Sequence, residues 1–312
     1  MQLDDRTAEP GAGPAEPAAP PPLLSTSSML GSLMAELAAR HETRQGGGWT
    51  GGIRCGLGMI DAKLRGLRPK STTGLLAEPN IGKSSLANQI LYQAAAFEGQ
   101  RVVGVYVTLE NDPENLLMKH LARISGWTIN ALESGEIRPD DPHLLRAVDM
   151  LAKTPLFYVR GNSAADPSLL IQRVNEARNL CGGKADVLMA LDYLQLYSRF
   201  FTGRTQMDQI GAVLPELKRI AAETGAALLV VVSQNRETNK SGNSTMFGAR
   251  GSGEIEYDFD TLLTLTKSDH PAPSGTLPLG LTAQKTRYGG QGATCRLNFN
   301  PDLAYFDRAL DL

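Results

Sequence analysis

Apolar positions along this chain follow two periods, one typical of strands and one typical of helices. Short apolar runs bounded by turn residues predict strands near 73–77, 102–107, 156–160, 186–191, 226–232, 260–266, 277–284 and 293–299. Apolar residues three and four positions apart predict helices near 83–98, 112–125, 140–152, 167–180 and 206–224. Pro215 should kink or restart the last of these helices.

The order of these elements predicts the fold class. Strands and helices alternate until the last three strands, which follow one another without helices. Alternation favours a mostly parallel sheet covered by helices on both faces, and the final strands favour an antiparallel section. We therefore expect an α/β fold with a mostly parallel sheet flanked by helices and an antiparallel C-terminal section.

The first 50 residues have a different pattern. Residues 1–22 are rich in Pro, Ala, Gly and Glu and predict a disordered tail. Ser28 is a candidate cap for a helix from Met29 to about Thr43, which three glycines at 46–48 end. One apolar stripe runs along this helix, formed by Leu30, Leu33, Met34 and Leu37. We expect three regions: a tail at 1–22, a linker helix within 23–48 and a main domain at 49–312.

Charge and cysteine content narrow the class of protein. The net charge is −2, so any contact with nucleic acid must be local rather than a generally basic surface. Three cysteines and four histidines are scattered without metal-ligand spacing, which argues against zinc and against a disulfide framework. The amino terminus has neither a basic region nor an apolar run long enough for a signal peptide or membrane span. We expect a cytoplasmic protein.

A phosphate-binding loop is the strongest motif. A short apolar strand leads into the sequence AEPNIGKSS, which opens a helix. Loop amides and the positive end of a helix dipole favour a polyanion there, so we predict that ATP binds with Mg²⁺. Lys83 would reach the β- and γ-phosphates and Ser84 would coordinate Mg²⁺. The first position holds Ala where the usual pattern has Gly. The predicted nucleotide-binding residues are Ala77, Pro79, Asn80, Ile81, Gly82, Lys83, Ser84 and Ser85.

Three further apolar strands end in polar residues. Asp192 follows one of them and could hold the Mg²⁺ from the side opposite Ser84. Glu110 follows a second and could deprotonate an attacking water, and Gln234 follows a third and could sense the γ-phosphate. Because parallel strands deliver their carboxyl ends to one edge, these groups form a coherent candidate active site.

The order of motifs resembles the carboxy-terminal ATPase domain of the DnaB-type replicative helicases, which has a RecA-like fold. The resemblance covers about 49–307 and rests on AEPNIGKS, VTLEND, LDYLQL, SQNR, RGSGEIEYDFD and QKTRYGGQG. That family also begins its phosphate loop with Ala. The resemblance implies that Glu110 is the catalytic base, that Asp192 is the Walker B carboxylate and that Gln234 is the γ-phosphate sensor.

Further roles come from the same resemblance. Lys285 and Arg287 match a pair that acts in trans as an arginine finger, although by themselves they would also fit a solvated hairpin. A loop with Arg250, Gly251 and Gly253 matches one that grips single-stranded DNA. It departs from the family where Gly251 replaces an acidic residue, and SQNR is one residue shorter than the family's SQLNR. Two more arginines could reach DNA from another loop, Arg199 and Arg204, beside a Phe200-Phe201 pair that suits core, interface or base stacking.

The resemblance implies a ring helicase that moves 5′ to 3′ on single-stranded DNA. We expect the ring to be a hexamer. Only a short helix and a Pro/Ala-rich stretch precede the ATPase domain in this sequence. We therefore expect a phage-like or accessory member that lacks the family's amino-terminal domain. Primase, a loader or another replication protein is then a possible partner. The alternative is a non-unwinding assembly protein regulated by ATP, and a RecA-like recombinase is disfavoured by LDYLQL.

Overall fold

The first 50 residues form a unit of their own. The computed structural model describes residues 23, 25–161, 166–234 and 258–308, and contacts divide the chain into one unit up to Thr50 and another from Gly51. Helix α1 (Thr26–Gln45) lies in the first unit and ends at Gly46 as predicted. Its cap is Ser25, whose hydroxyl accepts a hydrogen bond from the Ser28 N–H at 3.2 Å. The prediction of Ser28 is wrong because several adjacent hydroxyl residues can cap, and the earliest one adds three residues to the helix.

A nine-stranded sheet organises the second unit, in the order β3-β2-β4-β5-β1-β6-β7-β8-β9. The strands are β1 (Thr72–Ala77), β2 (Val102–Thr108), β3 (Leu156–Arg160), β4 (Asp186–Asp192), β5 (Ala227–Ser233), β6 (Thr261–Lys267), β7 (Leu277–Thr286), β8 (Thr294–Asn300) and β9 (Tyr305–Arg308). All pairs from β3 to β6 are parallel, and β7, β8 and β9 add antiparallel pairs. The predicted fold class is confirmed, and β9 was missed because it has only four residues.

The long helices also agree with the prediction. They are α2 (Lys83–Ala96), α3 (Pro113–Ser125), α5 (Pro142–Lys153), α6 (Pro167–Leu180) and α8 (Gln206–Thr224). Short ones were missed: η1 (Met59–Lys63), α4 (Ile129–Glu133), α7 (Leu194–Tyr197) and η3 (Ser198–Phe200). Helix α8 continues through Pro215, so the predicted restart is wrong. Buried residues on both sides of the proline, Leu214 and Leu217, hold the two halves in one packed helix.

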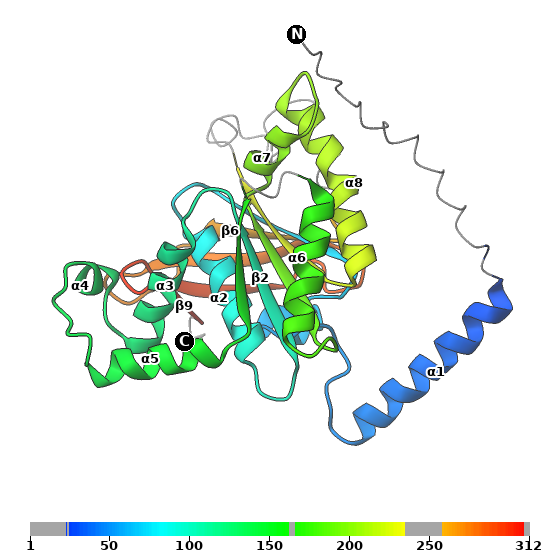
Figure 1. Cartoon of the computed structure of the whole chain (residues 1–312), viewed down its shortest axis with the longest axis horizontal. Coiled ribbons are helices and arrows are strands. Elements are labelled where there is room, and N and C mark those ends of the chain that lie inside the picture. Colours follow the sequence, from blue (N-terminus) through cyan, green and yellow to red (C-terminus); the bar gives the residue numbers. More distant parts are fainter. Residues whose placement is uncertain (1–22, 24, 162–165, 235–257, 309–312) are drawn as a thin grey trace, which may run out of the picture. The chain divides into compact units, whose positions relative to one another are not determined.

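Helices cover both faces of the sheet (Figure 1), and an apolar core fills the space on each face. Alternate residues of β1 show the division, since Leu75 packs in the core that contains α2 and Leu76 in the core that contains α6 and α8. Both side chains are fully buried. Continuous apolar strands are therefore required here, because neither face of these strands meets solvent. Within the described ranges, no helix has the length and apolar character needed to span a bilayer.

Candidate nucleotide site

The phosphate-loop motif lies between a buried strand and a helix, as predicted. Strand β1 ends at Ala77, which is fully buried, and α2 begins at Lys83. Two residues of the loop take left-handed backbone angles, Asn80 with φ 66° and Gly82 with φ 87°. The loop therefore turns sharply onto the first turn of α2, whose amides and dipole favour a bound polyanion. Lys83 and Ser84 lie half-buried on that first turn.

Gly82 is also required by what lies beneath it. A Cβ atom there would approach Phe299 at 2.7 Å and Phe306 at 2.9 Å. These two rings stack with centroids 4.4 Å apart. The side chain of Gln89 on α2 fixes the second ring's strand by bonding both its N–H and its C=O at 2.8 Å. Strands β8 and β9 thus form a floor for the phosphate loop, and the sequence motif did not reveal this support.

The predicted strand-end residues gather at the same edge of the sheet. Gln234 donates its backbone N–H to the carbonyl of Ala77 at 3.0 Å, so the end of β5 adjoins the start of the loop. Asp192 pairs with Thr108, and its carbonyl accepts the Leu109 N–H at 2.9 Å. Glu110 follows directly, with an exposed side chain. The loop, Glu110, Asp192 and Gln234 are therefore neighbours, because β2, β4, β5 and β1 are adjacent and parallel.

Asp192 has a buried carboxylate oxygen that could hold a metal ion. Its side chain is fully buried and accepts a hydrogen bond from the Tyr106 hydroxyl at 2.8 Å through Oδ2, whereas Oδ1 has no hydrogen-bond partner. Burial raises the pKa of Asp192, and the hydroxyls of Tyr106 and Ser84 and the charges of Lys83 and Lys119 oppose that rise. An unsatisfied buried carboxylate oxygen near a hydroxyl fits Mg²⁺, which takes one or two protein oxygens and fills its shell with phosphate and water.

Three residues that the sequence reading did not select support this edge. The hydroxyl of Tyr106, on β2, donates a hydrogen bond to Asp192 and also lies 3.4 Å from the Ser84 carbonyl on the first turn of α2. Gln195 ties α7 to the end of β5, donating to the Ser233 carbonyl at 2.6 Å and accepting from its N–H at 3.1 Å. Lys119 is half-buried, and burial lowers its pKa while the charges of Asp192 and Glu110 raise it. Periodicity alone assigns all three to core or surface.

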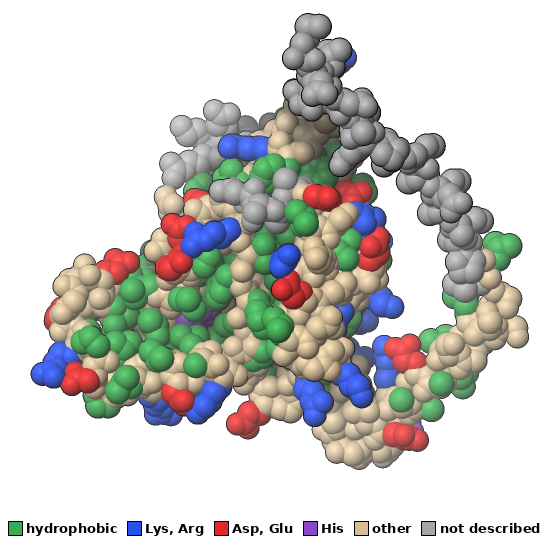
Figure 2. Space-filling view, viewed as in Figure 1, with side chains coloured by type: hydrophobic (Ala, Val, Ile, Leu, Met, Phe, Trp, Pro, Cys, Tyr) green, Lys and Arg blue, Asp and Glu red, His purple; other side chains and the backbone are tan. Residues whose placement is uncertain are grey.

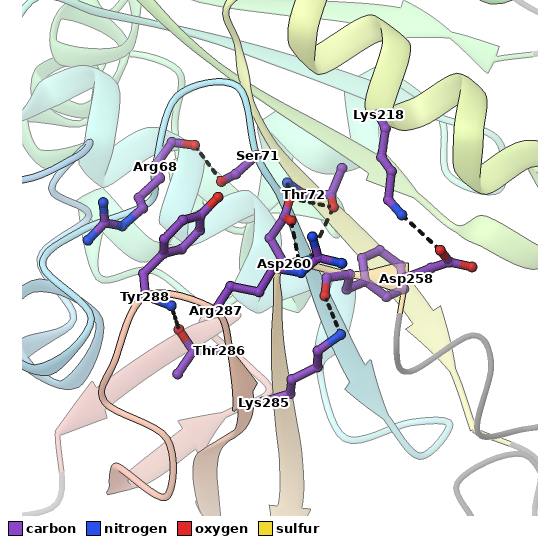
Figure 3. A network of polar contacts seen from close by, with 11 residues as sticks. Arg68, Ser71, Thr72, Lys218, Asp258, Asp260, Lys285, Thr286, Arg287 and Tyr288 are labelled. Carbon is purple, nitrogen blue, oxygen red and sulfur yellow. Dashed lines mark hydrogen bonds and ion pairs between the residues drawn. The ribbon is translucent and has the colours of Figure 1, made fainter. Parts of the chain in front are cut away.

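Lys285 and Arg287 lie at the opposite edge (Figure 3). Lys285 donates to the Phe259 carbonyl at 2.8 Å, and Arg287 Nε lies 3.5 Å from Asp260 Oδ1. Asp260 in turn accepts the N–H of Thr72, the first residue of β1, at 2.9 Å. The phosphate loop follows the last residue of β1, five steps or roughly 17 Å away. These two cations therefore do not join the cluster formed by the other predicted residues.

The predicted DNA contacts divide into two groups. Arg250, Gly251 and Gly253 lie outside the described residues. Arg199 and Arg204 are exposed and follow Asp192 beyond the carboxyl end of β4. Of the two adjacent phenylalanines, Phe201 packs against the core and Phe200 keeps 42% of its surface exposed. Only Phe200 remains available for an interface or for stacking.

A strand, a Gly-Lys-Ser loop and a helix beside a strand-end carboxylate define a P-loop nucleotide-binding protein, here with a RecA-like sheet. Within that class, the family model described as "DnaB-like helicase C terminal domain" matches residues 52–308. The chain therefore belongs to the DnaB-like helicase C-terminal domain family. Membership implies nucleotide binding with a divalent metal.

Proteins of similar sequence are named as replicative DNA helicases. A "Probable plasmid replicative DNA helicase" of Chlamydia psittaci is 24% identical over 86% of this chain and 58% of its own length. "Replicative DNA helicase DnaB" of Pasteurella multocida (strain Pm70) is 26% identical over 70% of this chain and 47% of its own. The chain thus spans about half the length of these relatives.

Solved structures agree on the fold. One of them, described as an ATPase domain, superposes with a TM-score of 0.75 at 15% identity, covering 92% of this chain and 99% of that one. A second, "The Structure Of A DnaB-Like Replicative Helicase And Its Interactions With Primase", gives a TM-score of 0.71 at 15% identity, covering 91% of this chain and 72% of that one.

Proposed function

We propose that this chain is the motor of a ring-forming helicase that hydrolyses ATP, with Mg²⁺, to move 5′ to 3′ along single-stranded DNA during replication. The observation that carries the proposal is the convergence of the phosphate loop, Glu110, Asp192 and Gln234 at one edge of the sheet. These groups supply an anion site, a base, a metal ligand and an amide, the set that phosphoryl transfer to water requires.

Each group has one task in the proposed reaction. Lys83 and the loop amides would hold the β- and γ-phosphates. Ser84 and Asp192 would hold Mg²⁺, which would supply positive charge beside the transferring phosphoryl group. Glu110 accepts a proton from the attacking water. Its exposed side chain at this edge of the sheet gives it access to that water. Gln234 hydrogen-bonds the γ-phosphate. Loss of that phosphate removes the hydrogen bond and so changes the contacts at the end of β5.

Lys285 and Arg287 act on the nucleotide of a neighbouring subunit. Their separation from the phosphate loop of their own chain, by roughly the length of β1, supports action in trans. A guanidinium that reaches a neighbour's γ-phosphate stabilises the charge that develops on it and makes hydrolysis depend on assembly.

A docking helix closes the ring, and hexamers are the expected assembly. The α1 stripe of Leu30, Leu33, Met34 and Leu37 is 48–62% exposed. The second unit carries an apolar surface of its own on α3 and α5, where Leu117, Leu145 and Val148 are 38–51% exposed. Figure 2 shows apolar side chains gathered over this part of the molecule. We place α1 of one copy on the α3–α5 surface of the next, since both apolar faces then leave water.

Single-stranded DNA is the proposed track. Arg250, Gly251 and Gly253 fall in the sequence between Gln234, at the nucleotide edge, and Asp258, which precedes β6 at the Arg287 edge. Arg199 and Arg204 add charge beyond the end of β4. By analogy with the helicase described with primase, a primase, loader or other replication protein is a further partner, and the cytoplasm is the site of action.

A strand-displacement assay tests the proposal. Forked DNA with a labelled strand is incubated with the chain, ATP and Mg²⁺, and Lys83→Ala serves as the matched control because it retains the fold without the phosphate contact. ATP-dependent release of the labelled strand by the wild type alone supports the helicase. Hydrolysis that DNA stimulates without any displacement supports the alternative, an ATP-regulated assembly protein.

A further inference from the structure

Asp260 is the centre of a polar network at the edge opposite the nucleotide site (Figure 3). Its side chain is only 14% exposed. One carboxylate oxygen, Oδ2, accepts from the N–H of Thr72 at 2.9 Å and from its hydroxyl at 3.2 Å. The other, Oδ1, lies 3.5 Å from Nε of Arg287. Asp260 thus spans from the first residue of β1 to the end of β7, and its two oxygens have different tasks.

The backbone repeats the same connection. The Asp260 carbonyl accepts the Arg287 N–H at 2.9 Å, and the Asp260 N–H donates to the Thr72 carbonyl at 3.0 Å. The main chain of Arg287 is therefore fixed against a residue that is itself bonded to a central strand. Because the carboxylate is attached to that same residue, its charge stays close to the point where the Arg287 side chain begins.

The residues on both sides of Arg287 are also held. Lys285 donates to the carbonyl of Phe259 at 2.8 Å. Tyr288 stacks on Arg68, with the guanidinium carbon 4.3 Å from the ring centroid. A register shift between β6 and β7 falls at Leu262 and Leu263, beside Lys285. Such a bulge re-aims the side chains that follow it, and here these are Lys285 and Arg287.

We propose that Asp260 is a positioning residue for Arg287, whose guanidinium it restrains at Nε so that the half-exposed side chain is held ready for a neighbouring subunit. The inference rests on the trans role of Arg287 proposed above. The Arg287 side chain is 52% exposed, whereas its carboxylate partner is nearly buried. An ion pair with one buried partner restricts the long arginine side chain and so reduces the entropy lost when it reaches a phosphate.

Asp260→Asn tests this role in the full chain. Asn has the same shape and can still accept from Thr72, but it no longer attracts Arg287 electrostatically. DNA-stimulated hydrolysis should fall about three- to thirtyfold in kcat, the range of an indirect coupling, with nucleotide affinity unchanged. Asp258→Asn is the matched control, because Asp258 is two residues away and pairs with Lys218 at 2.8 Å instead of with Arg287. The control should stay within about twofold.

Two further measurements separate positioning from support of the fold. The double variant Asp260→Asn, Arg287→Ala should be no slower than Arg287→Ala alone, because Asp260 acts only through Arg287. Mixing Asp260→Asn with Lys83→Ala should restore hydrolysis above the mean of the two, since the Lys83→Ala subunit offers an intact Asp260 and Arg287 to the other's intact pocket. If Asp260→Asn does not fold, Asp260→Glu, which shifts the charge by one methylene, undergoes the same mixing.

Each contrary result has a distinct meaning. Wild-type hydrolysis in Asp260→Asn, together with an inactive Arg287→Ala, overturns the positioning role and leaves the trans role intact. Additive losses in the double variant without recovery on mixing also overturn it, because Asp260 then acts on its own subunit through Thr72. Wild-type hydrolysis in Arg287→Ala overturns the trans role itself, and the positioning role with it.

Discussion

The two edges of the sheet differ in how they hold their charged groups. At the nucleotide edge, the buried carboxylate of Asp192 keeps one oxygen without a hydrogen bond. At the other edge, both oxygens of Asp260 have close cationic or donor neighbours. The first arrangement is costly in the isolated chain and suits a site that is completed by ligands. The second is complete in itself and suits a group that must keep one orientation before it meets its target.

Removing the Arg287 guanidinium should have the largest effect on the rate of ATP hydrolysis. Arg287→Ala should lower hydrolysis by about three to five decades while nucleotide affinity stays the same, because the guanidinium acts on a neighbour's transferring phosphate. Steady-state hydrolysis and a fluorescent nucleotide titration measure the two quantities. A mixture with Lys83→Ala should recover activity. If the two variants co-assemble and the mixture stays inactive, the two edges do not meet across subunits.

The base at the nucleotide edge should come next. Glu110→Gln keeps the shape and hydrogen bonding of the side chain but cannot accept the water's proton, so hydrolysis should fall by about two to four decades with ATP still bound. Glu114→Gln is a matched control on the following helix, where Glu114 pairs with Arg160 at the surface. Single-turnover hydrolysis decides the matter, and near-normal rates in Glu110→Gln remove it from the role of base.

The third prediction concerns the helix α1, which we propose brings the nucleotide edge of one subunit to the Arg287 edge of the next. Deleting residues 1–45 should shift the oligomer toward monomer and lower hydrolysis by about tenfold at concentrations where the intact chain assembles, by mass action. Deleting residues 1–22 is the control, because it retains α1. Light scattering reports the assembly. A hexamer that persists without α1 would show that the apolar stripe has no part in closing the ring.

The smallest effect is on stability. Burial raises the pKa of Asp192, so the folded chain holds its proton more tightly than the unfolded chain. Stability without Mg²⁺ or nucleotide should therefore fall as pH rises from the ordinary carboxyl range through that raised pKa, and the cost is fully present only above that pKa. Asp192→Asn removes the buried charge and should raise the melting temperature by about 2–4 °C at pH values where Asp192 is ionised.

The same variant tests the metal site. Asp192→Asn should lose most of the extra stabilisation that Mg²⁺ adds to nucleotide binding, because an amide oxygen is a weaker ligand than a carboxylate. Asp186→Asn, at the exposed start of β4, is the control for both measurements. A lower melting temperature in Asp192→Asn would mean that the carboxylate is satisfied in the free chain.

The sequence by itself was enough for the nucleotide edge. The positions of the strands along the chain, the Gly-Lys-Ser turn and the strand-end residues Glu110, Asp192 and Gln234 are local signals, since apolar runs and turn residues act within a few positions of one another. Parallel strands then place their ends at one edge without further information. The short elements α4, α7 and β9 gave no such signal, because four or five residues are too few to show a period that repeats clearly.

Tertiary structure decided everything that depends on contacts between distant segments. Gly82 rests on Phe299 and Phe306, more than 200 residues later, and Asp192 is held by Tyr106 from another strand. The separation of Arg287 from its own phosphate loop, and its attachment to Asp260, follow from the pairing of β1, β6 and β7. No periodicity encodes such pairings, because they arise from the burial of whole faces rather than from the order of neighbouring residues.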